Sequence, residues 1–142
     1  MQFSVCSREK AKKMAYKLKE PAIIISVTDS DKEPNIFAKN PYIKEICRVA
    51  FDDTDPDILL KREVLMRKED AEKIKECVIR NKDTVERIVV HCEAGVSRSA
   101  AIMAAIQLYL IGSADAIFSN PKYCPNFFCF EMMREAFFGE NN

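Results

Sequence analysis

The sequence is typical of an α/β fold, with a central, mostly parallel β-sheet of four or five strands and helices on both faces. Short apolar runs rich in β-branched residues alternate along the chain with segments of helical periodicity. Alternation of this kind indicates parallel strands joined by helical crossovers. The chain has 142 residues, enough for one core, so residues 1–142 are expected to form a single domain.

Four segments have the composition of strands. Residues 22–27 are continuously apolar apart from one serine, so this strand is expected at the centre of the sheet. The other strands are expected at residues 3–6, 46–51 and 88–90. Residues 36–43 are left unassigned, because Pro41 interrupts any long element there.

Helical patterns fill the intervals between these strands. Ser7 is a suitable N-cap for a helix that reaches about residue 18. The segment 100–111 is apolar on nearly every side and is therefore expected to be buried, with Gly112 ending it. Other helices are expected at residues 68–80 and 127–138, with a helical turn at 114–118 and a frayed tail at 139–142.

The segment from His91 to Ser99 is the most informative for function. It holds the only histidine of the chain, directly before Cys92, and Arg98 follows Cys92 after five residues. A loop between a strand and a helix N-terminus can cradle phosphate, because its N–H groups turn inward beside the positive end of the helix dipole. Gly95 permits the curl, and Arg98 can bind two phosphate oxygens. The expected phosphate-binding residues are Glu93, Ala94, Gly95, Val96, Ser97 and Arg98.

The same surroundings favour Cys92 as a thiolate, which is the reactive form of a thiol. A lone cysteine is more often a small buried apolar residue. Here cysteine, glycine, arginine and serine occur together at fixed spacing on a strand-to-helix turn, and this favours a functional thiol. Ser97 is expected to contribute only its N–H group.

His91-Cys92, five residues and Arg98-Ser99 together resemble the signature loop of the cysteine-dependent protein tyrosine phosphatases. The small dual-specificity branch and its compact bacterial and phage relatives are the most similar. The resemblance implies that Cys92 forms a phosphocysteine intermediate and that Arg98 holds the phosphate and the transition state. It also implies that His91 helps to keep the thiol ionised and that Ser99 aids departure of the thiolate. It implies no cofactor and no metal.

The proposed chemistry needs a general acid, because transfer of phosphate to sulfur expels an alcohol or phenol oxygen. Asp52, Asp53, Asp55 and Asp57 follow a predicted strand directly, where α/β proteins place their sites. Turn formation is the alternative role for each of these aspartates. The resemblance places the acid in this loop, with Asp53 as the best match and Asp55 and Asp52 as alternatives.

Two further features bear on the loop and on the substrate. Pro125-Asn126 resembles a turn in the dual-specificity branch whose asparagine braces the phosphate loop, and ordinary turn chemistry is the alternative. Phosphoinositide phosphatases of the superfamily carry extra lysines in this loop, whereas here Glu93 is present and lysine is absent. Phosphotyrosine in proteins is therefore the expected substrate, with phosphoserine, phosphothreonine or small phosphomonoesters as alternatives.

The composition excludes some other partners. Acidic and basic residues number 22 each, so there is no overall attraction to nucleic acid or to an anionic membrane. The N-terminus is too polar for a signal peptide and no apolar run spans a membrane, so a cytoplasmic location is expected. Six free thiols are then expected, and the spacing of Cys124 and Cys129 fits no common zinc pattern. The sequence does not indicate an oligomeric state.

Two other functions fit part of the motif. A rhodanese-like sulfurtransferase also carries its cysteine in a loop between strand and helix, but it needs neither Arg98 at this spacing nor an upstream acid. A phosphate-binding module that has lost catalysis would bind phosphotyrosine without turnover. The presence of both Cys92 and Arg98 disfavours that second alternative.

Overall fold

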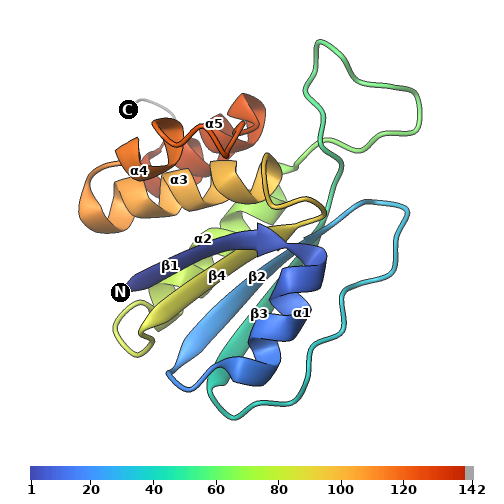
Figure 1. The fold of residues 1–142 in the computed structure, drawn as a ribbon. Coiled ribbons are helices and arrows are strands. Elements are labelled where there is room, and N and C mark those ends of the chain that lie inside the picture. Colours follow the sequence, from blue (N-terminus) through green and yellow to red (C-terminus); the bar gives the residue numbers. More distant parts are fainter. Residues whose placement is uncertain (140–142) are drawn as a thin grey trace.

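A computed structural model describes residues 1–139, in which a four-stranded sheet separates two layers of helices (Figure 1). The strands are β1 (Gln2–Ser7), β2 (Ala22–Thr28), β3 (Ile43–Ala50) and β4 (Arg87–Cys92). Their order is β1-β4-β2-β3, and every neighbouring pair is parallel. The predicted α/β class is confirmed. The expected fraying of the tail falls, except for Gly139, outside the described residues.

The burial of the strands explains their sequences. Every residue of the central strand β2 is buried, and so is every residue of β4 except Arg87. A strand covered on both faces gains from apolar side chains at every position, so these two runs do not alternate. The edge strand β3 is mixed in burial and begins at Ile43, three residues before the expected start. Its first residue, Ile43, pairs with Ala22, and a register shift follows, so that Ile23 pairs with Glu45.

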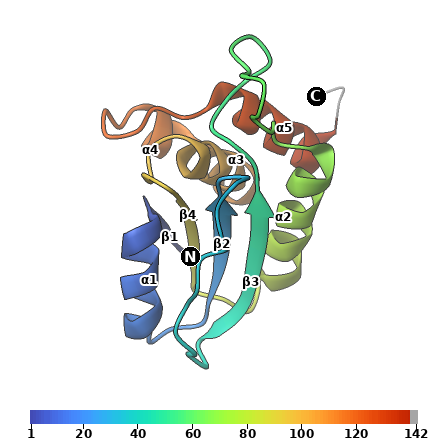
Figure 2. The ribbon, with the colours of Figure 1, turned by 90° about the vertical axis from the view of Figure 1, so that its right-hand side faces the viewer.

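The helices divide unequally between the two faces of the sheet (Figure 2). The helix α1 (Arg8–Lys17) lies alone on one face, where its Ala11 and Ala15 pack against β1, β2 and β4. Ser7 is its N-cap, as expected, since the hydroxyl accepts a hydrogen bond from the Lys10 amide at 3.1 Å. The other face carries α2 (Lys68–Asn81), α3 (Arg98–Ile111), α4 (Asp115–Phe118) and α5 (Phe127–Phe138).

The helix α3 lies at the centre of the larger layer. Its first ten residues, 98–107, are all buried, because the sheet covers one side and α5 covers another. This accounts for a helix that is apolar on every side. Gly112 ends it with a φ of 77°, a left-handed conformation that favours glycine.

All four strands point in one direction, so their carboxyl ends meet at a single edge of the sheet. Two long loops project from this edge, residues 29–42 and 51–67 (Figure 1). Ligand sites in parallel α/β folds lie at this edge. The aspartate loop that follows β3 and the cysteine loop that follows β4 are therefore brought to the same end of the molecule.

The described residues also bear on the expected absence of a membrane span and on the expected free thiols. No helix within residues 1–139 is long and apolar enough to cross a membrane. All six cysteines are free thiols; Cys124 is exposed and the other five are buried.

Candidate active site

The loop after β4 is packed closely against the end of β1. Gly95 in this loop has a φ of 75°, a region that side chains rarely adopt. A Cβ atom on Gly95 would lie 2.4 Å from the carbonyl carbon of Cys6 and 2.6 Å from the nitrogen of Ser7. Both the backbone angle and the available space therefore require glycine, and the loop is fixed against β1 at this residue.

The remainder of the loop is braced through its carbonyl groups. Three of them accept hydrogen bonds from neighbouring amides: Glu93 from Arg8, Val96 from Cys124 and Ser97 from Asn126. The Gly95 amide, in contrast, points inward to the Cys92 sulfur at 3.3 Å. With carbonyls held outside and an amide turned inside, the loop has the curl that an anion cradle requires.

Cys92 ends β4 at the floor of a cavity. Its side chain is almost completely buried, and the Cys92 sulfur lies 3.0 Å from the Ser99 hydroxyl oxygen. Burial raises the pKa of Cys6 to about 11 and that of Cys129 to about 12, so neither of these thiols is suited to act as a nucleophile near neutral pH. Cys92 is the thiol that lines the cavity.

Arg98 begins α3, and its side chain is only 5% exposed. Its Nη1 donates to the Phe51 carbonyl at 2.7 Å, and its Nη2 pairs with the Asp29 carboxylate at 2.7 Å. The buried Nε has no hydrogen-bond partner. A buried donor without an acceptor is costly, and Nε shares with Nη2 the edge of a guanidinium that binds two oxygens at once. This edge is suited to an anionic ligand.

The sequence did not single out Asp29. It directly follows the carboxyl end of β2, just as the aspartate loop directly follows β3. The argument that selected Asp52 and Asp53 by their place after a strand applies equally to Asp29, so this signal was present in the sequence.

His91 is completely buried, and its ring is held by three polar groups. Nδ1 lies 3.1 Å from the Cys92 carbonyl oxygen, which only accepts, so Nδ1 is the donor. Nε2 then accepts from the Ser26 hydroxyl at 2.6 Å and from the Asn35 amide nitrogen at 3.4 Å. Burial lowers the pKa of His91, although the hydrogen bond to Cys92 works in the opposite direction. The neutral ring therefore orients the Cys92 carbonyl, and its three polar partners are groups other than the Cys92 sulfur.

Asp53 lies over the phosphate loop. One of its carboxylate oxygens accepts hydrogen bonds from the Ser97 hydroxyl at 2.7 Å and from the Asn126 side-chain amide at 2.9 Å. The expectation that Ser97 contributes only its N–H group is therefore wrong. Ser97 is the N-cap residue of α3, but its hydroxyl makes no cap hydrogen bond and binds Asp53 instead.

Asn126 connects three parts of the site. Its backbone amide holds the Ser97 carbonyl, and its side-chain nitrogen also donates to the Thr54 carbonyl at 3.0 Å. Its side-chain oxygen accepts from the Cys129 amide and so caps α5. The bracing role and the turn role thus coexist, but the side chain braces the aspartate loop, and only the backbone braces the phosphate loop.

The two alternative acids have other partners. Asp52 accepts from the Ser30 amide and hydroxyl and from the Val64 amide, at 2.6 to 3.0 Å. Partial burial alone would raise the pKa of Asp52, but these hydrogen bonds and the charge of Arg98 lower it below its usual value. Asp55 accepts from the Asp57 amide at 2.8 Å within a turn and does not line the cavity. These contacts favour Asp53 over both alternatives.

The site is a cavity of about 560 Å³ at the carboxyl ends of the strands. Its lining comes from three separate loops: Asp29, Asp52, Asp53, Glu63, Cys92, Glu93, Ala94, Val96, Ser97 and Arg98. A thiol, a buried guanidinium and five carboxyl groups are therefore gathered around one space. Within residues 1–139, no group of three or more histidine, cysteine, aspartate or glutamate side chains is arranged to hold a metal ion.

The chain has the fold of the dual-specificity and tyrosine phosphatases. Human DUSP28 superposes with a TM-score of 0.62 at 18% identity, over 94% of this chain and 90% of that protein. PTPMT1 in complex with PI(5)P superposes with a TM-score of 0.59 at 12% identity, over 95% of this chain and 89% of that protein. The human tyrosine phosphatase-like serine/threonine/tyrosine-interacting protein superposes with a TM-score of 0.56 at 18% identity, over 81% of this chain and 75% of that protein. No protein-family model matches the sequence, and no curated protein matches it.

The close packing at Gly95 predicts a large loss of stability for Gly95→Ala. The substitution places a side chain in left-handed backbone and against the backbone of Cys6 and Ser7, which should together cost at least about 2 kcal/mol. The control is Gly112→Ala, where φ is equally positive but nothing lies within 4 Å of the added atom. It should lose only about 1 kcal/mol. Equal losses in urea unfolding would show that the loop is not packed as described.

The neutral state of His91 predicts a pH-dependent stability. The unfolded chain binds a proton at His91 as the pH falls through about 6.5, whereas the folded chain binds it only at lower pH. The free energy of unfolding should therefore fall as the pH drops through about 6.5 toward the lower pKa of the folded ring, by up to about 1.4 kcal/mol per pH unit. His91 is the only histidine. Urea unfolding of His91→Asn should show a flatter profile in this window, and an unchanged slope would contradict a neutral buried ring.

Proposed function

We propose that this protein is a phosphatase that hydrolyses phosphomonoesters through a cysteinyl-phosphate intermediate. The observation that carries the proposal is the shared cavity of Cys92, Arg98 and Asp53, in which the buried Nε of Arg98 has no partner. The likeness of the fold to dual-specificity phosphatases supports it. Loop amides and the unpartnered Nε of Arg98 would bind the phosphate, and the Cys92 sulfur would lie beneath the phosphorus.

In the first half-reaction, the Cys92 thiolate attacks the phosphorus and an S–P bond forms. The bond from phosphorus to the ester oxygen breaks, and Asp53 in its acid form gives its proton to that oxygen. Ser97 and Asn126 hold the Asp53 carboxyl over the loop, so the acid is positioned above the nucleophile.

In the second half-reaction, Asp53 is a carboxylate and takes a proton from water as the water oxygen attacks phosphorus. The S–P bond breaks and inorganic phosphate leaves. The Ser99 hydroxyl lies 3.0 Å from the sulfur and can donate a hydrogen bond to the departing thiolate. Arg98 binds the phosphoryl oxygens in both steps, because its guanidinium is held in place by Asp29 and Phe51.

The favoured substrate is phosphotyrosine in a phosphorylated protein. Its phenolate is a better leaving group than a serine or threonine alkoxide, for which Asp53 must transfer its proton fully. Phosphoserine, phosphothreonine and small phosphomonoesters remain possible substrates of the same chemistry. The cytoplasmic location expected from composition also remains a prediction.

Substitutions of Cys92 and Arg98 distinguish the proposed phosphatase from a sulfurtransferase and from a phosphate-binding module without catalysis. Cys92→Ser should abolish hydrolysis of nitrophenyl phosphate and still bind a phosphotyrosine peptide, because the loop amides and Arg98 are unchanged. Arg98→Lys should weaken both rate and binding, since lysine lacks the planar fork. Steady-state kinetics and isothermal calorimetry provide the two readouts. Release of thiocyanate from thiosulfate and cyanide, without phosphatase activity, would instead identify a sulfurtransferase. Binding of the phosphotyrosine peptide without turnover by the unmodified protein would identify a phosphate-binding module that lacks catalysis.

The role of Asp53 is tested by comparing leaving groups. Asp53→Asn keeps an oxygen that can accept from Ser97 and Asn126 but removes the transferable proton. Turnover of an alkyl phosphate should fall by about 10²-fold or more, and that of nitrophenyl phosphate much less, because its leaving group hardly needs a proton. Asp55→Asn is the matched control and should change neither rate substantially. A loss at Asp55 with none at Asp53 would transfer the acid role to Asp55.

A further inference from the structure

The cavity carries more negative charge than a phosphate ligand explains. Five carboxylates line it: Asp29, Asp52, Asp53, Glu63 and Glu93. Arg98 is the only cationic side chain among the described residues of this lining. Because acidic and basic residues are equal in number over the whole chain, this excess is local to the site.

Ion pairs offset only part of this charge. Asp29 pairs with Arg98, and Lys32 lies 3.5 Å from Asp29 and 3.4 Å from Glu93. The other three carboxylates accept hydrogen bonds from neutral donors only. For Glu63 this donor is the Leu60 amide at 2.8 Å, and for Asp52 and Asp53 the donors are the backbone and side-chain groups already described.

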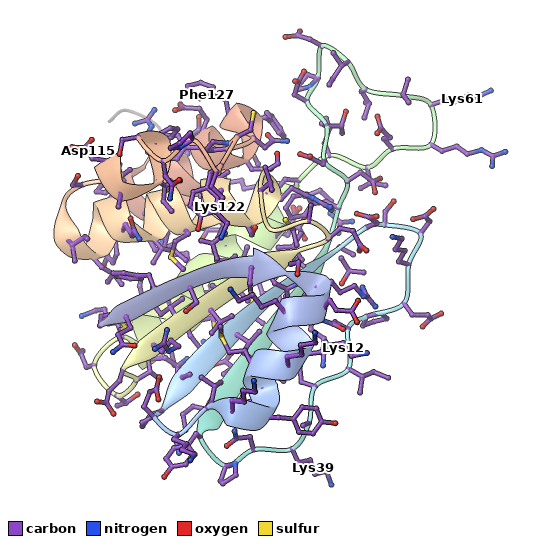
Figure 3. The ribbon with its side chains drawn as sticks, in the orientation of Figure 1. Lys12, Lys39, Lys61, Asp115, Lys122 and Phe127 are labelled. Atoms are coloured by element: carbon purple, nitrogen blue, oxygen red, sulfur yellow. The ribbon has the colours of Figure 1, made fainter. Side chains whose placement is uncertain are left out.

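The two loops that form the rim extend this charge beyond the lining. Asp31 and Glu33 follow Asp29 in one loop, and Asp55 and Asp57 follow Asp53 in the other. The basic residues of the second loop are Lys61, Arg62 and Arg67, and Arg67 pairs with Asp70 of α2 at 3.3 Å. Figure 3 shows Lys61 at the outer bend of that loop, with its side chain pointing away from the sheet.

Basic side chains also lie next to the site, and the Arg8 guanidinium donates to the Glu33 carbonyl at 2.8 Å. Arg8 and Lys12 of α1 line a small depression together with Glu9 and Glu93. Cationic groups therefore lie next to the loop that follows β2, and the carboxylates with only neutral donors, Asp52, Asp53 and Glu63, belong to the loop that follows β3. A ligand with its phosphate on Arg98 meets negative potential in that direction and mixed charge over α1.

We propose that this acidic rim selects phosphorylated protein segments with lysine or arginine beside the phosphoresidue and rejects polyanionic phosphates. The inference rests on the proposed phosphatase function. The buried, unpartnered Nε of Arg98 can bind one phosphate on the floor of the cavity. The unpaired carboxylates at the rim can bind cationic side chains next to that phosphate. A second phosphate or an acidic side chain at the rim meets the like charge of Asp52, Asp53 and Glu63, whose hydrogen bonds come from neutral donors.

A protein segment fits the rim better than a small amine phosphate does. The carboxylates come from two different loops, at residues 29–33 and 52–63, so they can meet flanking side chains on more than one side of the phosphoresidue. A single small amine beside a phosphate would contact only one of these groups of acids.

Three phosphotyrosine peptides that differ only in flanking residues test the inference. The flanks are arginine, alanine or glutamate, and the readout is kcat/KM at low and at high ionic strength. We expect the arginine peptide to exceed the glutamate peptide by about tenfold at low ionic strength, and the ratio to shrink as salt screens the rim. An inositol phosphate and phosphoethanolamine serve as the polyanionic and small-amine comparisons, and both should be poorer substrates than the arginine peptide.

A variant links the selectivity to the rim. Glu63→Gln keeps the acceptor for the Leu60 amide and removes one unpaired charge, so the ratio of arginine to glutamate peptide should fall by about threefold. The matched control is Glu76→Gln on α2, which removes a charge that does not line the cavity and should leave the ratio unchanged.

The failure of this inference is distinguishable from the failure of the proposed function. Equal rates for the three peptides, a faster glutamate peptide, or faster hydrolysis of either small comparison compound would overturn the selectivity and leave the phosphatase function intact. Absence of hydrolysis with every peptide and with nitrophenyl phosphate would overturn the proposed function itself.

Discussion

The contact between Gly95 and the end of β1 is the constraint on which the site depends. The loop after β4 lies so close to the backbone of Cys6 and Ser7 that no Cβ fits between them. This contact closes the loop into a curl, which sets the Gly95 amide toward the Cys92 sulfur and lets α3 begin at Arg98. An anion cradle of backbone amides has no side chain to hold it, so its shape must come from packing of this kind.

Around this loop, the site is assembled by polar contacts between segments distant in sequence. Asp29 and the Phe51 carbonyl, each just beyond a strand end, hold the guanidinium of Arg98. Asn126, at the start of α5, holds the aspartate loop by its side chain and the phosphate loop by its backbone. Each of these contacts satisfies a buried or partly buried polar group, so the same bonds that stabilise the fold also orient the side chains that line the cavity.

Patterns within short segments predicted the fold well. The continuous apolar run of β2, the Ser7 cap and the Gly112 stop are local signals, and all three were read correctly. The limits of prediction appear where partners are distant. Nothing near Ser97 indicated that its hydroxyl binds Asp53, and nothing in the spacing of Ser26 and Asn35 indicated that both bind His91.

The sequence by itself determined the α/β class, the position of the turn from Cys92 to Arg98 and the residue types that it presents. These follow from hydrophobic periodicity and from the angles that glycine and helix termini allow, which act within a few residues. The tertiary structure was needed to show that Asp29, Asp52 and Asp53 line the cavity, that Asp29 holds Arg98, and that five carboxyl groups line one space. Those outcomes depend on how parallel strands bring their following loops to one edge, and hydrogen-bond partners across that edge are separated by tens of residues.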